Sequence, residues 1–320
     1  MKNPDSFTCH VKEELVNLSC DNKKRLKSLL AAFIRINATL SICNKQTIVI
    51  LTTENAKIAK FLYQSIFDVY QYKSELSIRN KSNLSKGRYC RLSLGEASHH
   101  IINDLDIDFL ETKISKKLVA NDETISSYLA GAFLASGSVN SPHTSNYHLE
   151  ICLNNENYAK WMLHLFSRYK GANVAPKIAK RRDKFIIYLK KSDQIAEFLI
   201  MTGAVSSCME FENVRLSRDV TNSTNRMFNS DAANMKKTYE TAKRQIDEIQ
   251  YINRCLGIEN IEDEKMKILC QLRLENETAS LLELSLLMSE KTGKSISKSN
   301  INHLFRKIHG YYQKISTTDK

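Results

Sequence analysis

Apolar positions along residues 1–205 follow two periods. In some segments they recur every three or four residues, which is typical of helices, and in others at every second residue, which is typical of strands. The elements predicted in the first half are a helix at 26–37, strands at 38–42 and 47–52 with a turn at Asn44-Lys45, a helix at 54–70, strands at 73–79 and 87–94, and a helix at 96–105. The first half is therefore predicted to have the order αββαββα.

The same order of elements returns from residue 125 onward. The elements predicted there are a helix that ends near Ser136, strands through Val139 and at 148–153, a helix at 156–169, a hairpin at 175–190 and a helix at 193–201. A local echo supports the register, because Thr53-Glu54-Asn55-Ala56 opens the middle helix of the first half and Asn155-Glu156-Asn157-Tyr158 opens it in the second. We interpret residues 1–205 as a duplicated α+β unit.

Two different patterns follow the repeat. A polar segment leads from about residue 205 into a helix with apolar side chains at Ile246, Ile249 and Ile252, and three further helices are predicted at 262–275, 280–290 and 297–312. The predicted domains are the first half with an N-terminal arm at 1–110, the second half at 111–205, a linker segment and helix at 206–255, and an all-α domain at 256–320.

Composition narrows the class of partner. The chain has 47 Lys and Arg against 35 Asp and Glu, and its net charge of +12 favours a polyanion. Its apolar stretches are short and interrupted, so we expect neither a signal peptide nor a membrane segment. The eight cysteines form no CxxC pair, which predicts reduced core thiols, and the adjacent Cys9 and His10 are the nearest approach to a metal site, a role that the sequence does not favour.

Residues 129–138, LAGAFLASGS, resemble the LAGLIDADG motif of homing endonucleases. In that family two such helices pack side by side, and each ends in a carboxylate that binds the metals needed for DNA cleavage. Here Ser136 stands at the metal position of the second motif and Asn37 at that of the weaker first motif, residues 30–38. Neutral side chains do not supply the anionic oxygens that Mg²⁺ prefers. We therefore predict a small-residue helix interface with no catalytic residue, no metal, no cofactor and no nuclease activity.

A basic hairpin is the candidate phosphate-binding surface of the repeat. Its members are Lys177, Lys180, Arg181, Arg182, Lys184, Lys190 and Lys191. Such a cluster fits DNA phosphates. A solvated charged hairpin explains the same residues equally well, and both interpretations stay open here.

The last three helices have the order and lengths of a helix-turn-helix domain. Ser280 and Glu283 have the spacing of a capping box, and Ile301, Leu304, Phe305 and Ile308 form the predicted packing face of the final helix. The predicted DNA-binding residues are Ser297, Lys298, Ser299, Asn302, His303, Arg306 and Lys307. Asn302 has the amide that pairs with adenine and Arg306 the fork that pairs with guanine. The alternative is a polar helix face in a protein–protein module.

The combination of a degenerate double LAGLIDADG scaffold with a C-terminal helix-turn-helix resembles the WhiA family of bacterial DNA-binding regulators. The most specific stretches are residues 128–151, 225–238 and 271–308. The resemblance implies a transcriptional regulator or nucleoid-associated factor in cell division, chromosome segregation or sporulation. Two positions depart from the family pattern: Phe305, where a basic residue is expected, and Asn300, where glycine is expected.

One polar stretch before the last domain matches the family pattern more closely than a linker requires. The matching residues are Asn225, Arg226, Asn229, Asp231, Asn234, Lys236 and Lys237. They are interpreted either as ties between the linker and the scaffold or as contacts to DNA.

The favoured function is a cytoplasmic, nucleoid-associated, sequence-specific DNA-binding protein that is not an enzyme. Its expected partners are double-stranded DNA and other regulatory proteins, with no membrane. Two alternatives are a residual endonuclease or maturase, and a scaffold that senses a protein or small ligand and reports through the DNA-binding tail.

Overall fold

The computed structural model describes residues 6–18, 22–43, 46–81, 87–109 and 114–318 of the 320. The turn expected at Asn44-Lys45 lies outside them. Contacts divide the chain into a first unit, residues 1–218, and a second unit, residues 219–320.

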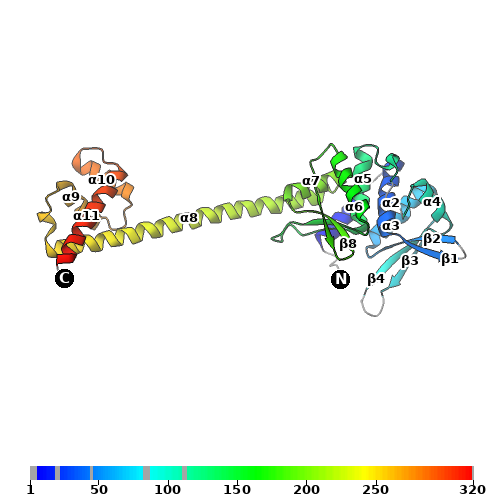
Figure 1. Cartoon of the computed structure of the whole chain (residues 1–320), viewed down its shortest axis with the longest axis horizontal. Coiled ribbons are helices and arrows are strands. Elements are labelled where there is room, and N and C mark those ends of the chain that lie inside the picture. Colours follow the sequence, from blue (N-terminus) through cyan, green and yellow to red (C-terminus); the bar gives the residue numbers. More distant parts are fainter. Residues whose placement is uncertain (1–5, 19–21, 44–45, 82–86, 110–113, 319–320) are drawn as a thin grey trace. The chain divides into compact units, whose positions relative to one another are not determined.

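The first unit contains two copies of one α+β arrangement (Figure 1). The first copy comprises α2 (Lys23–Asn37), β1 (Thr39–Cys43), β2 (Gln46–Thr53), α3 (Ala56–Tyr70), β3 (Glu75–Asn80), β4 (Arg88–Ser93), the 3-10 turn η1 (Gly95–Ala97) and α4 (Ser98–Asp104). The second comprises the 3-10 turn η2 (Lys116–Val119), α5 (Asp122–Ser136), β5 (Gly137–Val139), β6 (Leu149–Leu153), α6 (Glu156–Arg168), β7 (Lys177–Arg181), β8 (Lys184–Leu189) and α7 (Ser192–Thr202).

Both copies pair their strands in the same way. The sheets have the orders β1-β2-β4-β3 and β5-β6-β8-β7, and the neighbouring strands are antiparallel. The predicted αββαββα duplication is therefore confirmed.

The two LAGLIDADG-like helices, α2 and α5, pack against each other through small residues. Ala32 and Ala132 are fully buried, and a Cβ placed on Gly131 would lie 2.2 Å from the carbonyl oxygen of Leu29. Backbone therefore meets backbone at this crossing, which confirms the predicted small-residue interface.

An N-terminal helix that the sequence analysis missed, α1 (Phe7–Asn17), packs onto this core. Ser6 caps it, and Phe7, Val11 and Leu15 supply a buried stripe at four-residue spacing. The Thr8 hydroxyl donates to the carbonyl of Val139 at 2.7 Å and accepts from the Val139 amide at 2.9 Å. The predicted arm of the first half is thus a helix bonded to the edge strand of the second.

A single helix, α8 (Val205–Cys255), follows α7. The sequence predicts a polar linker segment before a shorter helix, but residues 205–255 are helical throughout. The carboxylate of Glu14 on α1 accepts from the Ser206 amide at 2.6 Å and the Ser207 amide at 2.8 Å. These contacts satisfy amide groups of the first turn of α8, which have no partner within the helix.

The second unit builds its own core around the end of α8. Its further elements are the 3-10 turn η3 (Ile258–Asn260), α9 (Glu264–Glu275), α10 (Leu281–Thr292) and α11 (Lys298–Thr318). The Arg273 side chain is buried in this core, donates to the carbonyls of Asn276 and Ala279, and lies 5.5 Å from the Phe305 ring centre. One arginine therefore holds the α9–α10 loop and α11 together.

Candidate nucleic-acid interface

Caps at the two ends of α10 fix the turns that lead into this helix and into the final helix. The predicted capping box is present, since Ser280 Oγ accepts from the Glu283 amide at 3.2 Å and the Glu283 carboxylate accepts from the Ser280 amide at 2.6 Å. Gly293 ends α10 in the left-handed conformation, with φ 64°. The Ile296 amide donates to Ser289 Oγ at 2.9 Å, which ties the turn back to α10.

One face of α11 is buried and the other is open. Ile301, Leu304, Phe305 and Ile308 are buried, as the apolar spacing predicted. The predicted contact residues Ser297, Lys298, Ser299, Asn302, His303, Arg306 and Lys307 are all exposed. At about 100° per residue, Ser299, Asn302, His303 and Arg306 lie along the middle of the open face, with Lys298 and Lys307 on its two borders.

Two basic residues of this face differ in their surroundings. Lys307 forms an ion pair with Asp263 at 3.6 Å, so this side chain is directed toward the first turn of α9. Arg306 has no hydrogen-bond or ion-pair partner among the described residues. Its guanidinium is therefore available to a ligand.

Neither departure from the family pattern alters the middle of this face. Phe305 lies in the core, and Asn300 has an ordinary helical backbone that does not require glycine. Phe305 is buried under Arg273, so its position belongs to the core of the unit. Asn300 is in the first turn of α11, where its backbone amide donates to Ser297 Oγ at 3.3 Å, and its φ is negative. Neither position removes a basic side chain from the exposed face.

The basic hairpin divides between the two faces of its sheet. Side chains alternate across a strand, so Lys177, Arg181 and Lys184 share the face opposite the buried Ile187, and Lys190 joins them beside the Tyr188 ring at 5.4 Å. Lys180 instead lies over Phe185, Arg182 forms the turn, and Lys191 is at the N-cap position of α7 without a capping bond from its side chain. Four of the seven predicted residues are thus brought together.

The first sheet offers a matching group that the sequence analysis missed. Arg79 and Arg91 share a face with Tyr89, opposite the buried Leu92. Neither arginine has an ion-pair partner within the described part of the chain. Alternation around the buried Leu92 was a signal in the sequence that could have identified both.

The degenerate metal positions hold neutral groups beside a lysine. Asn37 Oδ1 accepts from the Thr52 amide at 2.9 Å, and Ser136 Oγ is buried without a hydrogen-bond partner in the described structure. Lys12 reaches from α1 to donate to the carbonyl of Leu134 at 3.0 Å. A largely buried ammonium therefore lies at the end of α5, where the LAGLIDADG motif places its carboxylate.

Lys12 and Asn37 line one cavity of about 1,230 Å³. Glu13 and Lys57 form an ion pair in its wall at 2.6 Å, and this contact holds the pKa of Glu13 below its usual range. Cys9 also lines the cavity, and burial raises the pKa of its thiol.

The described structure contains no cluster of side chains suited to binding a metal ion. No group of three or more His, Cys, Asp or Glu side chains is arranged to hold an ion among the described residues. The Cys9 thiol contacts Glu13 and Asn55, whereas His10 is exposed. These two neighbours do not share a site.

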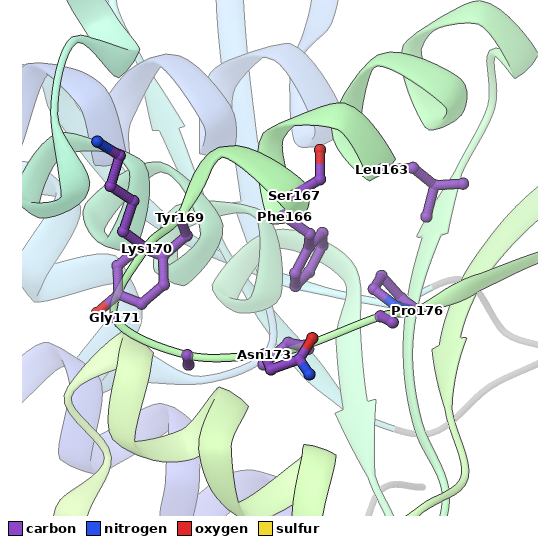
Figure 2. Close-up of a pocket in the computed structure, with 11 residues that line it drawn as sticks. Leu163, Phe166, Ser167, Tyr169, Lys170, Gly171, Asn173 and Pro176 are labelled. Atoms are coloured by element: carbon purple, nitrogen blue, oxygen red, sulfur yellow. The ribbon is translucent and has the colours of Figure 1, made fainter.

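A second cavity, of about 530 Å³, lies between the end of α6 and the loop before β7. Figure 2 shows that loop passing below Phe166 to Pro176, with the Lys170 side chain directed away. Lys170 is the one charged residue in this lining, so the cavity does not match the chemistry predicted for the chain.

The residues of the polar stretch on α8 that match the family pattern are all exposed. They are Asn225, Arg226, Asn229, Asp231, Asn234, Lys236 and Lys237. The described structure gives one of them a polar partner, an ion pair of 4.0 Å between Lys236 and Glu240 on the same helix. Among the described helices, none combines the length and the apolar character needed to cross a membrane.

The two αββαββα halves, joined through small-residue helices, define a LAGLIDADG-like scaffold. The helices α9, α10 and α11 that follow, with α10 capped at both ends, define a helix-turn-helix domain. Three family descriptions match in chain order: the WhiA N-terminal LAGLIDADG-like domain at residues 23–108, the WhiA LAGLIDADG-like domain at 125–221 and the WhiA C-terminal HTH domain at 224–312. The chain belongs to the WhiA family.

Relatives and a solved structure agree with this assignment. The chain is 38% identical over 313 residues to "Probable cell division protein WhiA" of Enterococcus faecalis, covering 97% of this chain and 98% of the relative. It is 38% identical over 315 residues to the protein of that name in Staphylococcus carnosus, covering 97% of each. The crystal structure of full-length WhiA from Thermatoga maritima has the same fold, with 23% identity, a TM-score of 0.58 and coverage of 97% and 98%.

Proposed function

We propose that the chain is a sequence-specific DNA-binding protein that regulates transcription or organises the nucleoid, and that it does not cleave DNA. The observation that carries the proposal is the open face of α11, where Asn302 and Arg306 lie together on a helix whose opposite face is buried. An exposed amide and guanidinium in the N-terminal half of a helix-turn-helix recognition helix match the donors and acceptors of base edges.

The scaffold has a supporting role in this proposal. Arg79 and Arg91 on the first sheet, and Lys177, Lys184 and Lys190 on the second, provide cations for phosphate groups. Such contacts hold a duplex without reading its sequence. The scaffold thus raises affinity, and α11 supplies specificity.

The biological process follows the names of the relatives, which are called probable cell division proteins. We place this chain in cell division, with chromosome segregation and sporulation as related processes, and in the cytoplasm at the nucleoid. Other regulatory proteins are its second proposed class of partner.

Lack of cleavage is supported by charge at the degenerate site. Asn37 and Ser136 provide no anionic ligand, and the Lys12 ammonium repels a divalent cation placed at the end of α5. A two-metal mechanism needs the opposite arrangement.

The test is fluorescence anisotropy with labelled genomic duplex fragments over a salt series, comparing the full chain with Lys298→Ala/Arg306→Ala. We expect the double variant to lose preference for its best fragment and to keep weak, strongly salt-dependent binding. Lys265→Ala is the matched control, because it removes an exposed cation from α9 instead. Equal affinity and preference in the double variant and the wild type would sink the assignment of α11 as the reader.

A second candidate function is a scaffold that senses a ligand and reports through α11. The cavity at Lys12 favours it, because that cavity is large enough for a small molecule and is lined by charged side chains. The test is DNA affinity measured with and without added nucleotides, inorganic phosphate or protein extract. This candidate is rejected when none of these additions shifts the affinity.

A further inference from the structure

The middle of α8 is a helix without a covering element in the described structure. Every residue from Asp219 to Lys237 is exposed. Asn, Ser, Thr and Asp are frequent there, and these residues favour helices weakly because their side chains compete for the backbone. Contacts within such an exposed helix stabilise it little, and the ion pair between Lys236 and Glu240 is the one that the described structure shows here. A bound partner would supply the packing contacts that this part of the helix lacks.

The side chains of this segment divide into two faces. At about 100° per residue, Asn222, Asn225, Arg226, Asn229 and Lys236 gather on one face. The single acidic residue between Val220 and Tyr239, Asp231, lies on the far side of the helix. Asp219 and Glu240 lie on the same side as these residues, at the two ends of the segment, and Glu240 forms the ion pair with Lys236. Between those two ends, the face presents amides and cations with no carboxylate among them.

We propose that this face of α8 is a second DNA-binding surface that enters the major groove of duplex DNA. The proposal shares with the proposed function the premise that the chain binds duplex DNA, but it does not depend on α11 as the reader. An α-helix fits the major groove, where amides pair with adenine and arginine with guanine, and lysines contact the phosphates.

Small residues on the same helix support this partner. Ala233 lies within the amide and basic face and Ala232 lies at its border, just before Lys236 and Lys237. Short side chains allow the helix backbone to approach base edges closely, and a methyl group makes apolar contact with thymine. Continuous helices that cross a major groove in this way are an established mode of DNA binding.

The opposite face is less suited to a second copy of the chain. Val220 and Met227 are exposed and share one side of the helix. A helix seam repeats apolar residues every three or four positions, but Ser223, Asp231 and Asn234 occupy the intervening and following positions. Leu216 extends this line, whereas the exposed Phe228, Met235 and Tyr239 lie about 100° further around the helix, with Asp231 between the two groups. No single apolar seam therefore runs through the segment, so the polar face is the stronger candidate for contact.

The experiment measures the affinity of the full chain for a labelled duplex by anisotropy at low salt. The test variant is Arg226→Ala/Asn229→Ala/Lys236→Ala, and Asn234→Ala is its control, since it removes the same amide about 140° away around the helix. Both are made in the wild-type chain and in Lys298→Ala/Arg306→Ala. Alanine favours helix, so far-UV circular dichroism and thermal melting check that folding is retained.

We expect the triple variant to bind about tenfold or more weakly in both backgrounds, and Asn234→Ala to bind as its parent. Helical circular dichroism should rise when duplex is added to the wild type and rise less in the triple variant. Unchanged binding by the triple variant in both backgrounds overturns the proposal, while the effect of the α11 changes alone decides the proposed function separately. A dimer that Met227→Asp abolishes, together with unchanged DNA affinity of the triple variant, also overturns it and assigns the segment to a second copy.

Discussion

Helix α5 is buried along most of its length, whereas helix α11 buries one face and leaves the other open. Both carry the residues that the sequence singled out for function. In α5 the small residues that allow close packing are present, and the carboxylate that would bind metal is replaced by Ser136. In α11 the packing residues and the polar residues occupy separate faces.

This difference shows that packing and chemistry can be separated within one motif. Gly131 is required by the distance between two backbones, whatever stands at position 136. The Arg306 side chain is exposed and does not pack in the core, so a substitution there should affect binding and not folding. Substitutions at the two helices should therefore have different readouts.

The largest expected effect comes from adding a methyl group at Gly131. Its Cβ would lie 2.2 Å from the Leu29 carbonyl oxygen, so Gly131→Ala must separate α5 from α2 and should cost about 1–3 kcal/mol of unfolding free energy. Gly310→Ala on α11 is the matched control, because a Cβ there has nothing within 4 Å. It should stabilise its helix by up to about 1 kcal/mol. Urea denaturation measures both, and equal stabilities would break the comparison.

The next effect separates two kinds of contact on α11. Arg306→Ala should reduce affinity by about 1–3 kcal/mol for the preferred site and relax preference at one base pair. Lys298→Ala, at the border of the face, should weaken all sequences similarly and lower the salt slope by about one. Anisotropy with the preferred duplex and single-base variants distinguishes them. A uniform loss in Arg306→Ala would place that side chain on phosphate instead.

A smaller effect tests the lysine at the degenerate site. Restoring carboxylates with Asn37→Asp/Ser136→Asp should permit only weak Mg²⁺ binding, because the Lys12 ammonium lies at the end of α5. Adding Lys12→Met should tighten binding by about tenfold, as measured by titration calorimetry. Efficient cleavage is expected from neither variant, since DNA and water must also be placed. Equal metal affinity with and without Lys12 would show that its charge does not act there.

The smallest effect concerns the cap at the start of α10. Hydrogen bonds from Ser280 lower the pKa of Glu283 below its ordinary value of 4.5. Because the folded-state pKa is depressed, the cap stabilises α10 above pH 4.5, and this stabilisation is lost as pH falls through the lower folded-state pKa. Melting temperature against pH should show this loss in the wild type and not in Glu283→Gln. Parallel curves would contradict it.

Much of the fold could be predicted from periodicity. The duplicated αββαββα order, the small-residue interface and the buried positions Ile301, Leu304, Phe305 and Ile308 were all confirmed. These features depend on local spacing, which the chain displays directly.

Features that depend on partners distant in sequence were missed. The helix at Phe7–Asn17 is short, and its contacts with Val139 and Leu134 are not visible in local spacing. The helix through residues 219–237 was missed for the opposite reason, since its composition favours helix weakly and its apolar residues, Val220, Met227, Phe228 and Met235, follow no single line along the helix that would reveal its period. Grouping of the basic residues needed strand register, which placed Lys180 apart from Lys177.

Helix α1 also bears on the order in which the chain folds during synthesis. It is synthesised before the other helices of the described structure, yet Thr8 bonds to Val139, 131 residues later, and Glu14 bonds to Ser206, 192 residues later. Contacts of such sequence separation form slowly, because a long loop must close before they add stability. The contacts of Cys9 with Asn55 and of Glu13 with Lys57 can form once the first half has been made, whereas those of Thr8 with Val139 and of Glu14 with Ser206 must wait until the second half and the start of α8 have emerged.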